Sequence, residues 1–307
     1  MTSARPVDVA VGVVIRDDGA VLLGQRPPGK PYAGWWEFPG GKLERGESVA
    51  DALVRELDEE LGLRVQGSCP WVVRRFVYPH ATVLLHFRRV FDFDGTPHSR
   101  EGQAFAWLMP GAIDVAPLLP ATVPVIAWLR LPAASVRSAA AALGDDAFVA
   151  ALECRLRDRR VAQLLLDEPA LAPARFETLF YRVTTLCRAH RVPVLIGSRH
   201  PESFWRAASG VLLASGDLMR IAARPALPTV AAEISDRVAL GHAEALGIDF
   251  VVASPAEPGA GAAGLSALLA ETGLPAYADA SWAVSAGDAL RAGAHGVAHP
   301  AQFWQDH

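Results

Sequence analysis

Three glutamates in the first quarter of the sequence have the spacing of one helix face. Glu56, Glu59 and Glu60 occupy positions i, i+3 and i+4, which lie close together on the surface of an α-helix. Like charges placed this way destabilise an isolated helix by about 0.2–0.5 kcal/mol per pair. A bound cation would offset that repulsion, and hard carboxylate oxygens suit Mg²⁺ or Mn²⁺. The spacing therefore predicts a divalent-metal site.

The residues around these glutamates predict a helix that holds them in place. Leu53, Leu57 and Leu61 recur at helical spacing, which indicates an amphipathic helix over residues 50–61 with one apolar face. Gly62 follows directly and can adopt the left-handed conformation in which many helices end. The carboxylates are therefore expected on a face of the helix that is not buried in the core.

A second pattern links the helix to the loop before it. Glu47 can pair with Arg55 and so fix the loop onto the helix. The alternative interpretation is a solvated acidic helix face, the usual role of a run of charged residues. That alternative accounts for the carboxylates, but it leaves Gly41, Gly62 and the Glu47–Arg55 combination unexplained. The pattern as a whole favours a site that binds metal and phosphate.

The spacing from Gly41 to Leu63 resembles the Nudix box: glycine, five residues, glutamate, seven residues, then REUxEExGU with U aliphatic. Every fixed position of that pattern is matched. Residues 7–130 also resemble the MutT branch of the family, the 8-oxo-dGTP diphosphatases. The segments that carry this second resemblance, in the expected order, are Val11–Ile15, Gln25–Arg26, Glu37–Lys42, Glu101–Gln103 and Pro120–Ile126.

The resemblance implies hydrolysis of a nucleoside triphosphate to the monophosphate and pyrophosphate, with Mg²⁺ or alternatively Mn²⁺ as cofactor. Metal lowers the pKa of a bound water and neutralises phosphate oxygens. Either Glu56 or Glu101 would take the proton of the attacking water, and Arg55 and Glu47 complete the catalytic set. The implied metal ligands are the Gly40 carbonyl, Glu56, Glu59, Glu60 and Glu101.

The same resemblance places the substrate. Arg26 and Lys42 would neutralise phosphate oxygens. Thr122 stands where the MutT pattern has an asparagine that reads the oxidised purine, and a hydroxyl offers fewer hydrogen bonds than an amide. The substrate is therefore expected to be 8-oxo-dGTP or, alternatively, another nucleoside diphosphate derivative. The implied substrate-binding residues are Arg26, Glu37, Phe38, Lys42, Tyr78 and Thr122.

Composition limits the other classes of function. The chain has 307 residues and a net charge of −4, so no overall basic field recruits a nucleic-acid polymer. Cys69, Cys154 and Cys187 have no paired spacing, which argues against disulfides or zinc and fits a reducing cytoplasm. No apolar run approaches the roughly 20 residues of a membrane helix. The oligomeric state is not fixed by the sequence.

The first part of the chain is predicted to contain several strands and two helices. Residues 9–15 and 21–25 are expected to pair as a hairpin around a turn at 17–19. Further strands are expected at 71–76, 82–91 and 104–109, and a second helix at 125–131. With the Nudix resemblance, this predicts an α/β/α sandwich with a mixed sheet.

A domain boundary is expected at Pro132, giving domains at 1–131 and 132–307. The second domain alternates short apolar runs with helical stretches, which indicates a parallel sheet covered by helices. Eight such units predict a (β/α)₈ TIM-like barrel, and an open doubly wound sheet is the alternative. The expected strands are at 134–138, 161–166, 194–197, 210–213, 229–232, 250–253, 276–278 and 296–298.

This second domain resembles the thiamine-phosphate synthase (TenI-like) barrels in layout and in a few phrases, such as Ala245–Val252 and Leu290–Val297. The functional positions of that synthase do not match: Gln163–Leu165, Gly197–Ser198 and Asp279–Ser281 stand where its substrate and phosphate ligands are expected. We therefore expect no synthase activity. A ligand-binding regulatory module and a supporting scaffold are the two remaining hypotheses for this domain.

Overall fold

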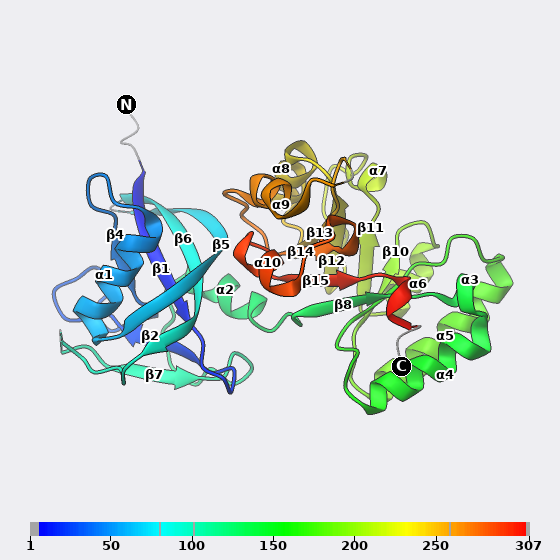
Figure 1. The fold of residues 1–307 in the computed structure, drawn as a ribbon, viewed down its shortest axis with the longest axis horizontal. Coiled ribbons are helices and arrows are strands. Elements are labelled where there is room, and N and C mark those ends of the chain that lie inside the picture. The colour runs from blue at the N-terminus through cyan, green and yellow to red at the C-terminus, as the bar shows by residue number, and fades with distance from the viewer. Residues whose placement is uncertain (1–5, 80, 101, 258, 305–307) are drawn as a thin grey trace. The chain divides into compact units, whose positions relative to one another are not determined.

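The computed structural model describes residues 6–79, 81–100, 102–257 and 259–304. The chain divides into two compact units (Figure 1). Unit 1 runs to Leu131 and includes Glu271–Gly273, and unit 2 comprises Pro132–Ala270 and the residues from Leu274 onward. Among the described residues, none of the helices has the length and apolarity that crossing a membrane requires.

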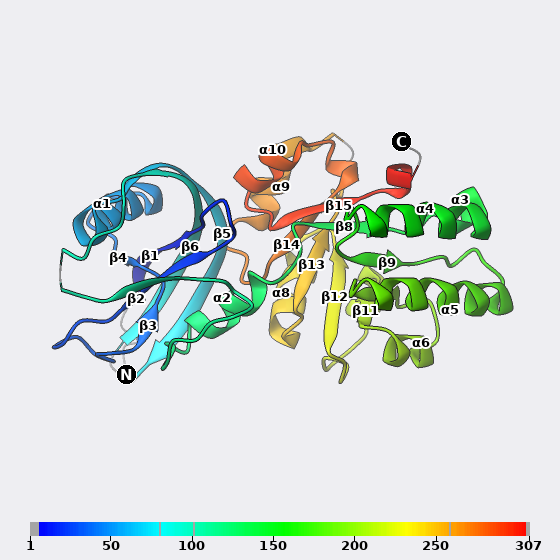
Figure 2. The ribbon, with the colours of Figure 1, turned by 90° about the horizontal axis from the view of Figure 1, so that it is seen from below.

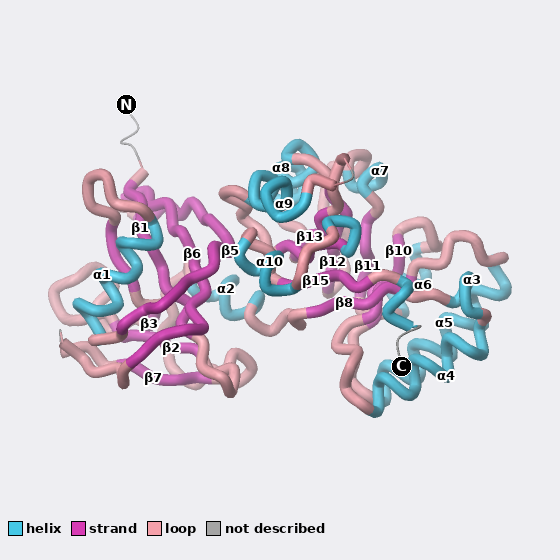
Figure 3. Tube along the Cα trace, viewed as in Figure 1, coloured by secondary structure: helices cyan, strands magenta, loops and turns pink. Residues whose placement is uncertain are grey.

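Unit 1 contains, within the described residues, two sheets (Figure 3). The larger sheet has the order β4-β1-β6-β5, formed by β1 (Val7–Val14), β4 (Gly40–Lys42), β5 (Arg64–Tyr78) and β6 (Ala81–Asp94). The smaller sheet has the order β3-β2-β7, formed by β2 (Val21–Gln25), β3 (Trp36–Glu37) and β7 (Phe105–Leu108). Because β1 is antiparallel to β4 and parallel to β6, the predicted mixed sheet is confirmed.

Helix α1 (Val49–Leu61) packs its leucines against the larger sheet. Leu53 and Leu57 are fully buried there, and a Cβ added at Gly12 of β1 would crowd the Leu53 side chain. Ser48 caps the start of the helix by accepting from the Asp51 amide, and Gly62 ends it with φ at 66°. The predicted helix and its glycine end are confirmed, and the close approach to β1 fixes which face of α1 stays open.

The predicted hairpin of the first two strands is wrong. The chain does turn back, since the Gly19 amide donates to the Arg16 carbonyl. However, β1 and β2 meet only at the bridge between Ile15 and Val21 and then enter different sheets. The physical reason is that β4 and β6 occupy the two edges of β1, so no edge is left for β2.

The second helix of unit 1, α2 (Thr122–Trp128), begins three residues before its predicted start. Its buried face carries Val125, Ile126 and Trp128, as the apolar spacing indicated. The Thr122 amide donates to the Leu119 carbonyl, and this turn brings the chain into the helix. Thr122 is therefore part of a buried helix start, with its side chain in the interior of unit 1.

The described residues of unit 2 form a closed barrel of eight parallel strands, which confirms the TIM-like prediction and excludes the open sheet. Each strand pairs in parallel with the next, and the last pairs with the first. The strands are β8 (Ala134–Arg137), β9 (Leu164–Leu166), β10 (Val194–Gly197), β11 (Gly210–Leu213), β12 (Thr229–Ile234), β13 (Phe250–Ala253), β14 (Ala276–Asp279) and β15 (Gly296–His299).

Helices surround the barrel, and α4 and α5 lie side by side along it (Figure 2). Their inner faces bury Phe148, Phe176 and Phe180 against the first strands of the barrel, which forms an apolar layer between helices and strands. The helices of unit 2 are α3 (Ala140–Leu143), α4 (Asp145–Arg157), α5 (Pro173–Ala189), α6 (Glu202–Ala207), α7 (Ser215–Leu218), α8 (Arg237–Leu246), α9 (Gly261–Leu269) and α10 (Ala286–Arg291), with 3₁₀ turns η1 (Ala280–Trp282) and η2 (Ala301–Trp304).

Candidate active site

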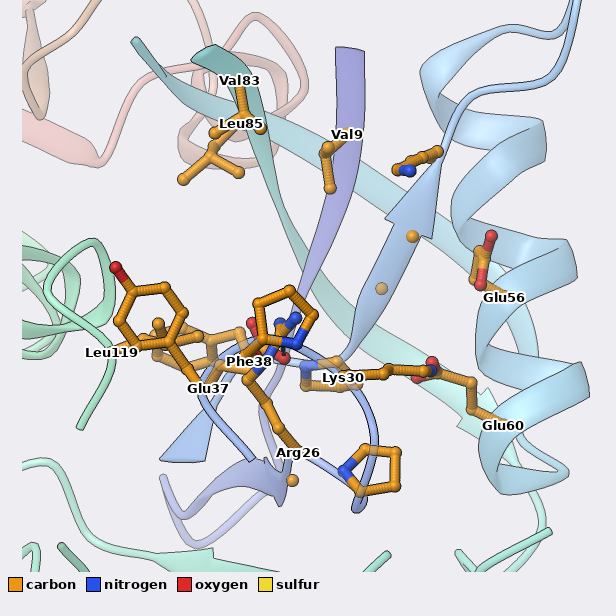
Figure 4. Close-up of a pocket in the computed structure, with 18 of the residues that line it drawn as sticks. Val9, Arg26, Lys30, Glu37, Phe38, Glu56, Glu60, Val83, Leu85 and Leu119 are labelled. Carbon is orange, nitrogen blue, oxygen red and sulfur yellow. Dashed lines mark hydrogen bonds and ion pairs between the residues drawn. The ribbon is translucent and has the colours of Figure 1, made fainter. Parts of the chain in front are cut away.

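A cavity of about 590 Å³ opens in unit 1 between α1 and the strand ends of both sheets (Figure 4). Helix α1 contributes Glu56 and Glu60 to its lining, and the chain from β3 to β4 contributes Glu37 to Lys42. Val83 and Leu85 of β6 form an apolar wall. One end of the cavity is therefore acidic and the other apolar, which suits a ligand with a metal-bound charged part and a flat organic part.

The glycines of β4 make room for the acidic end. A Cβ at Gly41 would overlap the carboxylate of Glu56, so glycine at this position lets the carboxylate lie directly over the strand. Gly40 has φ at 144°, and a Cβ there would overlap the Ala10 carbonyl of β1. The two glycines thus have different roles: Gly40 permits the strand to pair, and Gly41 permits the glutamate to sit beside it.

Arg55 ties the acidic residues together from outside the cavity. Its guanidinium donates to Glu47 Oε1 and Oε2 at 2.9 and 3.0 Å, to Glu56 Oε1 at 2.9 Å and to the Lys42 carbonyl at 3.1 Å. It also contacts Glu59 at 3.2 Å. The hydrogen bonds that Arg55 donates to Glu47 raise the pKa of Arg55 and lower the pKa of Glu47. The predicted Glu47–Arg55 pair is confirmed.

Replacing Arg55 with lysine is expected to lower kcat/KM about tenfold, because a lysine keeps the charge but loses the rigid fork that holds Glu47 and Glu56 at once. Steady-state kinetics of the full-length variant would measure this. Arg100→Lys is the matched control. Arg100 is exposed, and its guanidinium lies 3.6 Å from the carboxylate of Asp58, which is on the same helix as Arg55. Equal activity of both variants would show that the fork does not position Glu56.

Arg26 and Glu37 form a charged pair inside the cavity. Arg26 donates to Glu37 Oε1 at 2.5 Å and to the Pro31 carbonyl at 2.6 Å. Burial raises the pKa of Glu37, and the charge of Arg26 acts against that rise. Burial, with the nearby Glu37 charge, also raises the pKa of Tyr78 to about 12, so its hydroxyl stays a hydrogen-bond donor. These groups present both donors and acceptors to a ligand.

The apolar end of the cavity is built around aromatic rings. Tyr78 ends β5, and its ring lies 5.4 Å from that of Tyr32 and 4.6 Å from that of Phe76. Phe38 lines the cavity but is itself 3 % exposed, and it meets Phe87 edge to face. Tyr78 therefore offers a ring surface to a ligand, whereas Phe38 mainly closes the floor of the cavity.

The structure gathers most of the predicted site residues around this one cavity but not all of them. Glu47, Arg55 and Glu59 lie beside the acidic end without lining it, and Glu59 has a side chain that is 61 % exposed. Thr122 is buried at the start of α2 and does not line the cavity. Glu101 lies outside the described residues. The predicted residues that line the cavity are Arg26, Glu37, Phe38, Gly40, Lys42, Glu56, Glu60 and Tyr78.

The acidic end has the donor chemistry of a magnesium site. Glu56 and Glu60 supply carboxylate oxygens to the same cavity, and the Cβ-sized space beside Gly41 is what lets Glu56 reach it. Among the described residues, no three His, Cys, Asp or Glu side chains are gathered closely enough to enclose a metal on their own. Mg²⁺ commonly keeps waters and phosphate oxygens as ligands, so two carboxylates and a carbonyl fit it.

Sequence analysis missed Lys30 and Gln103, which also line the cavity. Figure 4 shows the Lys30 and Glu60 side chains pointing toward one another. Lys30 lies in the Pro-Gly-rich loop between β2 and β3, and this composition signals a turn but not which way its lysine points. Only the fold of that loop, in which the rings of Tyr32 and Trp35 meet edge to face with centroids 5.3 Å apart, brings Lys30 to the cavity.

Comparison with known proteins gives matches over unit 1. The family model described as "NUDIX domain" matches residues 6–129. The CTP pyrophosphohydrolase of Escherichia coli K12 is 41% identical over 131 residues, which are 40% of this chain and 93% of that protein. The 8-oxo-dGTP diphosphatase of Haemophilus influenzae is 35% identical over 120 residues, 39% of this chain and 88% of that protein. A solved structure from a study of MutT from Aliivibrio salmonicida and Vibrio cholerae is 33% identical to this chain, with a TM-score of 0.36. The match covers 41% of this chain and 97% of the solved chain.

Proposed function

Since the chain belongs to the Nudix family and is a hydrolase of phosphorus-containing anhydrides, we propose that it converts a nucleoside triphosphate to the monophosphate and pyrophosphate. The observation that carries this proposal is one cavity that joins Glu56 and Glu60 of α1 to the cations Arg26 and Lys42. Carboxylates hold a divalent ion, and the cations neutralise phosphate oxygens beside it. Detection of released pyrophosphate in the presence of Mg²⁺ tests it.

Glu56, Glu60 and the Gly40 carbonyl would hold the Mg²⁺. When bound, the ion lowers the pKa of the attacking water and offsets charge on the phosphate chain. Arg55 holds the Glu56 carboxylate in one orientation, and Lys42 offers its ammonium group at the cavity rim. Of the two candidate bases, Glu56 lines the cavity, so we propose that its carboxylate accepts the proton. Comparing Glu56→Gln with Glu101→Gln across pH tests this assignment, because loss of the base removes the acidic limb of the rate profile.

The first candidate substrate is 8-oxo-dGTP, which would make the enzyme one that removes oxidised nucleotides from the pool. The 35% identity to the Haemophilus influenzae 8-oxo-dGTP diphosphatase supports it. The aromatic end of the cavity, with Tyr78, also provides a ring surface for a purine. An assay of 8-oxo-dGTP against dGTP with Mg²⁺ is the direct test. Equal and slow turnover of the two would refute this substrate while leaving the reaction type intact.

A cytosine nucleotide is the second candidate, favoured by the Arg26–Glu37 pair. A carboxylate accepts from the N4 amino group of cytosine, and Arg26 holds the Glu37 carboxylate in place by donating to it. Both residues line the cavity, and Arg26 Nη1 lies 2.5 Å from Glu37 Oε1. Thr122, in contrast, is buried away from the cavity and offers no group there for a purine. The 41% identity to the Escherichia coli CTP pyrophosphohydrolase adds support.

Glu37→Gln is expected to reduce the ratio of kcat/KM for CTP over UTP about tenfold, because an amide loses the charge that favours the cytosine amino group and can donate to the uracil carbonyl. The measurement is a competition between the two nucleotides for the same enzyme. The variant's rate with 8-oxo-dGTP serves as the internal control for folding. An unchanged ratio would remove Glu37 from base recognition and leave 8-oxo-dGTP as the better candidate.

A further inference from the structure

Tyr32, in the loop between β2 and β3, has a backbone conformation that is unusual for its residue type. Its φ is 62°, in the left-handed region where a residue with a bulky side chain is strained. Gly29 and Gly34 of the same loop have φ at 87° and 83°, and glycine adopts such angles without strain. The chain thus has a tyrosine at a position that would suit a glycine. A strained residue of this kind points to a role for its side chain.

Hydrogen bonds on both sides of Tyr32 hold the loop in this conformation. The Arg26 amide donates to the Trp35 carbonyl at 2.9 Å, and the Gly34 amide donates to the Arg26 carbonyl at 2.9 Å. The Arg26 side chain also donates to the Pro31 carbonyl at 2.6 Å, and the Trp35 amide donates to the Tyr32 carbonyl at 3.0 Å. The loop is therefore a built part of the cavity wall, and its hydrogen bonds offset the strain at Tyr32.

The loop brings the Tyr32 ring to the apolar end of the cavity. Tyr32 is half-buried and lines the cavity together with Tyr78. Its ring meets that of Trp35 edge to face, and it lies 5.4 Å from the Tyr78 ring with 58° between the two planes. A flat ligand ring held between two others needs about 7 Å between their planes, since each stacked contact takes about 3.5 Å. A ligand ring therefore stacks on one side of the tyrosine pair and is not enclosed between them.

The same loop contributes side chains to both ends of the cavity. Lys30 and Tyr32 are two positions apart, and both line it. The Lys30 side chain points toward Glu60 at the acidic end (Figure 4), whereas the Tyr32 ring meets Tyr78 at the apolar end. A ligand that fills the whole cavity thus has a charged part and a flat part. A nucleoside triphosphate has both parts, and inorganic triphosphate has only the first.

We propose that Tyr32 is a substrate-binding residue that stacks on the nucleobase and selects nucleoside triphosphates over phosphate chains without a base. This inference rests on the proposed hydrolysis and names a residue that determines its substrate class. Stacking needs only a flat π-face, which every base has, so Tyr32 serves cytosine and 8-oxoguanine alike. The choice between bases then depends on groups that hydrogen-bond to the edge of the base, such as Glu37.

Tyr32→Asn in the full-length protein removes the ring, while asparagine still accepts the left-handed backbone. We expect KM for CTP or 8-oxo-dGTP, whichever the wild type hydrolyses, to rise about tenfold with kcat changed less than about twofold, because stacking stabilises substrate and transition state alike. The inhibition constant of inorganic triphosphate, which has no base, should stay unchanged. Tyr32→Phe keeps the ring and should keep the wild-type KM. Tyr181→Asn, which removes an exposed tyrosine from α5, is the matched control.

Isothermal titration calorimetry with CMP and 8-oxo-dGMP separates this inference from the proposed function, because it needs no turnover. Hydrolysis of the triphosphates with the same KM in wild type and Tyr32→Asn would overturn the inference alone. Tighter binding of a monophosphate by the wild type than by Tyr32→Asn, without release of pyrophosphate from either triphosphate, would overturn the proposed function alone.

Two further results would overturn the role of Tyr32. One is an equal loss of affinity for inorganic triphosphate in Tyr32→Asn, which would show that the ring acts only through the fold of the loop. The other is a wild type that neither binds the monophosphates nor hydrolyses the triphosphates. Tyr32→Gly also lacks the ring and accepts the same φ, so it keeps the test decisive if Tyr32→Asn fails to fold.

Discussion

Replacing Glu56 or Glu60 with glutamine is expected to lower kcat about a thousandfold, which corresponds to about 4 kcal/mol of transition-state stabilisation. Both carboxylates line the cavity, and the Glu56 side chain is 17 % exposed. A glutamine keeps the size and one acceptor oxygen but loses the charge that holds a divalent ion. The expected loss therefore comes from weaker metal binding with an unchanged fold.

Asp58→Asn is the control for this pair of variants. Asp58 lies on the same helix, is largely exposed and forms an ion pair with Arg100 at 3.6 Å. It should keep full activity. Electron paramagnetic resonance of bound Mn²⁺ gives a readout that does not depend on turnover, and the glutamine variants should bind the ion more weakly. A glutamine variant with wild-type activity and Mn²⁺ affinity would disprove the metal assignment.

Gly41→Ala is expected to lower kcat about a hundredfold while the melting temperature changes little. The added methyl group would occupy the position of the Glu56 carboxylate, which is the flexible end of a side chain and can move away. The backbone at Gly41 does not have a positive φ, so an alanine is not strained there. The substitution is therefore expected to displace the Glu56 carboxylate without disturbing the core.

Two other glycines make the Gly41 experiment specific. Gly67→Ala in β5 should change neither activity nor stability, because nothing lies within 4 Å of the added group. Gly40→Ala should lower the melting temperature, because φ is 144° and the methyl group would overlap the backbone carbonyl of Ala10. Circular dichroism melts and steady-state rates measured on all three variants separate the effects. A stable Gly41→Ala enzyme with normal kcat would show that the Glu56 position is not required.

Local patterns in the sequence were sufficient to predict the helix that carries the three glutamates. The leucine spacing, the Gly62 end, and the pairing of Glu47 with Arg55 all depend on residues fewer than 20 positions apart. The barrel was also predictable, because each strand needs only a short apolar run and each connection a helix. Alternation of that kind is a local signal for a parallel sheet covered by helices, whereas the choice between a closed barrel and an open sheet was decided by the tertiary structure.

The failures of sequence reasoning all concern partners that are distant in the chain. The first two strands have hairpin composition, yet β4 and β6 take both edges of β1. Glu59 has the same helical spacing, but in the structure it lies beside Arg55 and does not line the cavity. Thr122 stands at an expected base-reading position, and its burial in α2 became visible only in the fold.

By itself the sequence predicted a hydrolase of phosphorus-containing anhydrides, because the pattern that carries this prediction is an order of side chains along one loop and one helix. Tertiary structure decided which of those side chains share a cavity, and it brought Arg26, Glu37 and Tyr78 from separate strands to its other end. It also brought Arg137 of β8 and Glu233 of β12 together across the barrel interior. Contacts between side chains of different strands depend on strand register and on closure of the sheet. Both are fixed by packing over the whole domain, so no local pattern in the sequence reveals them.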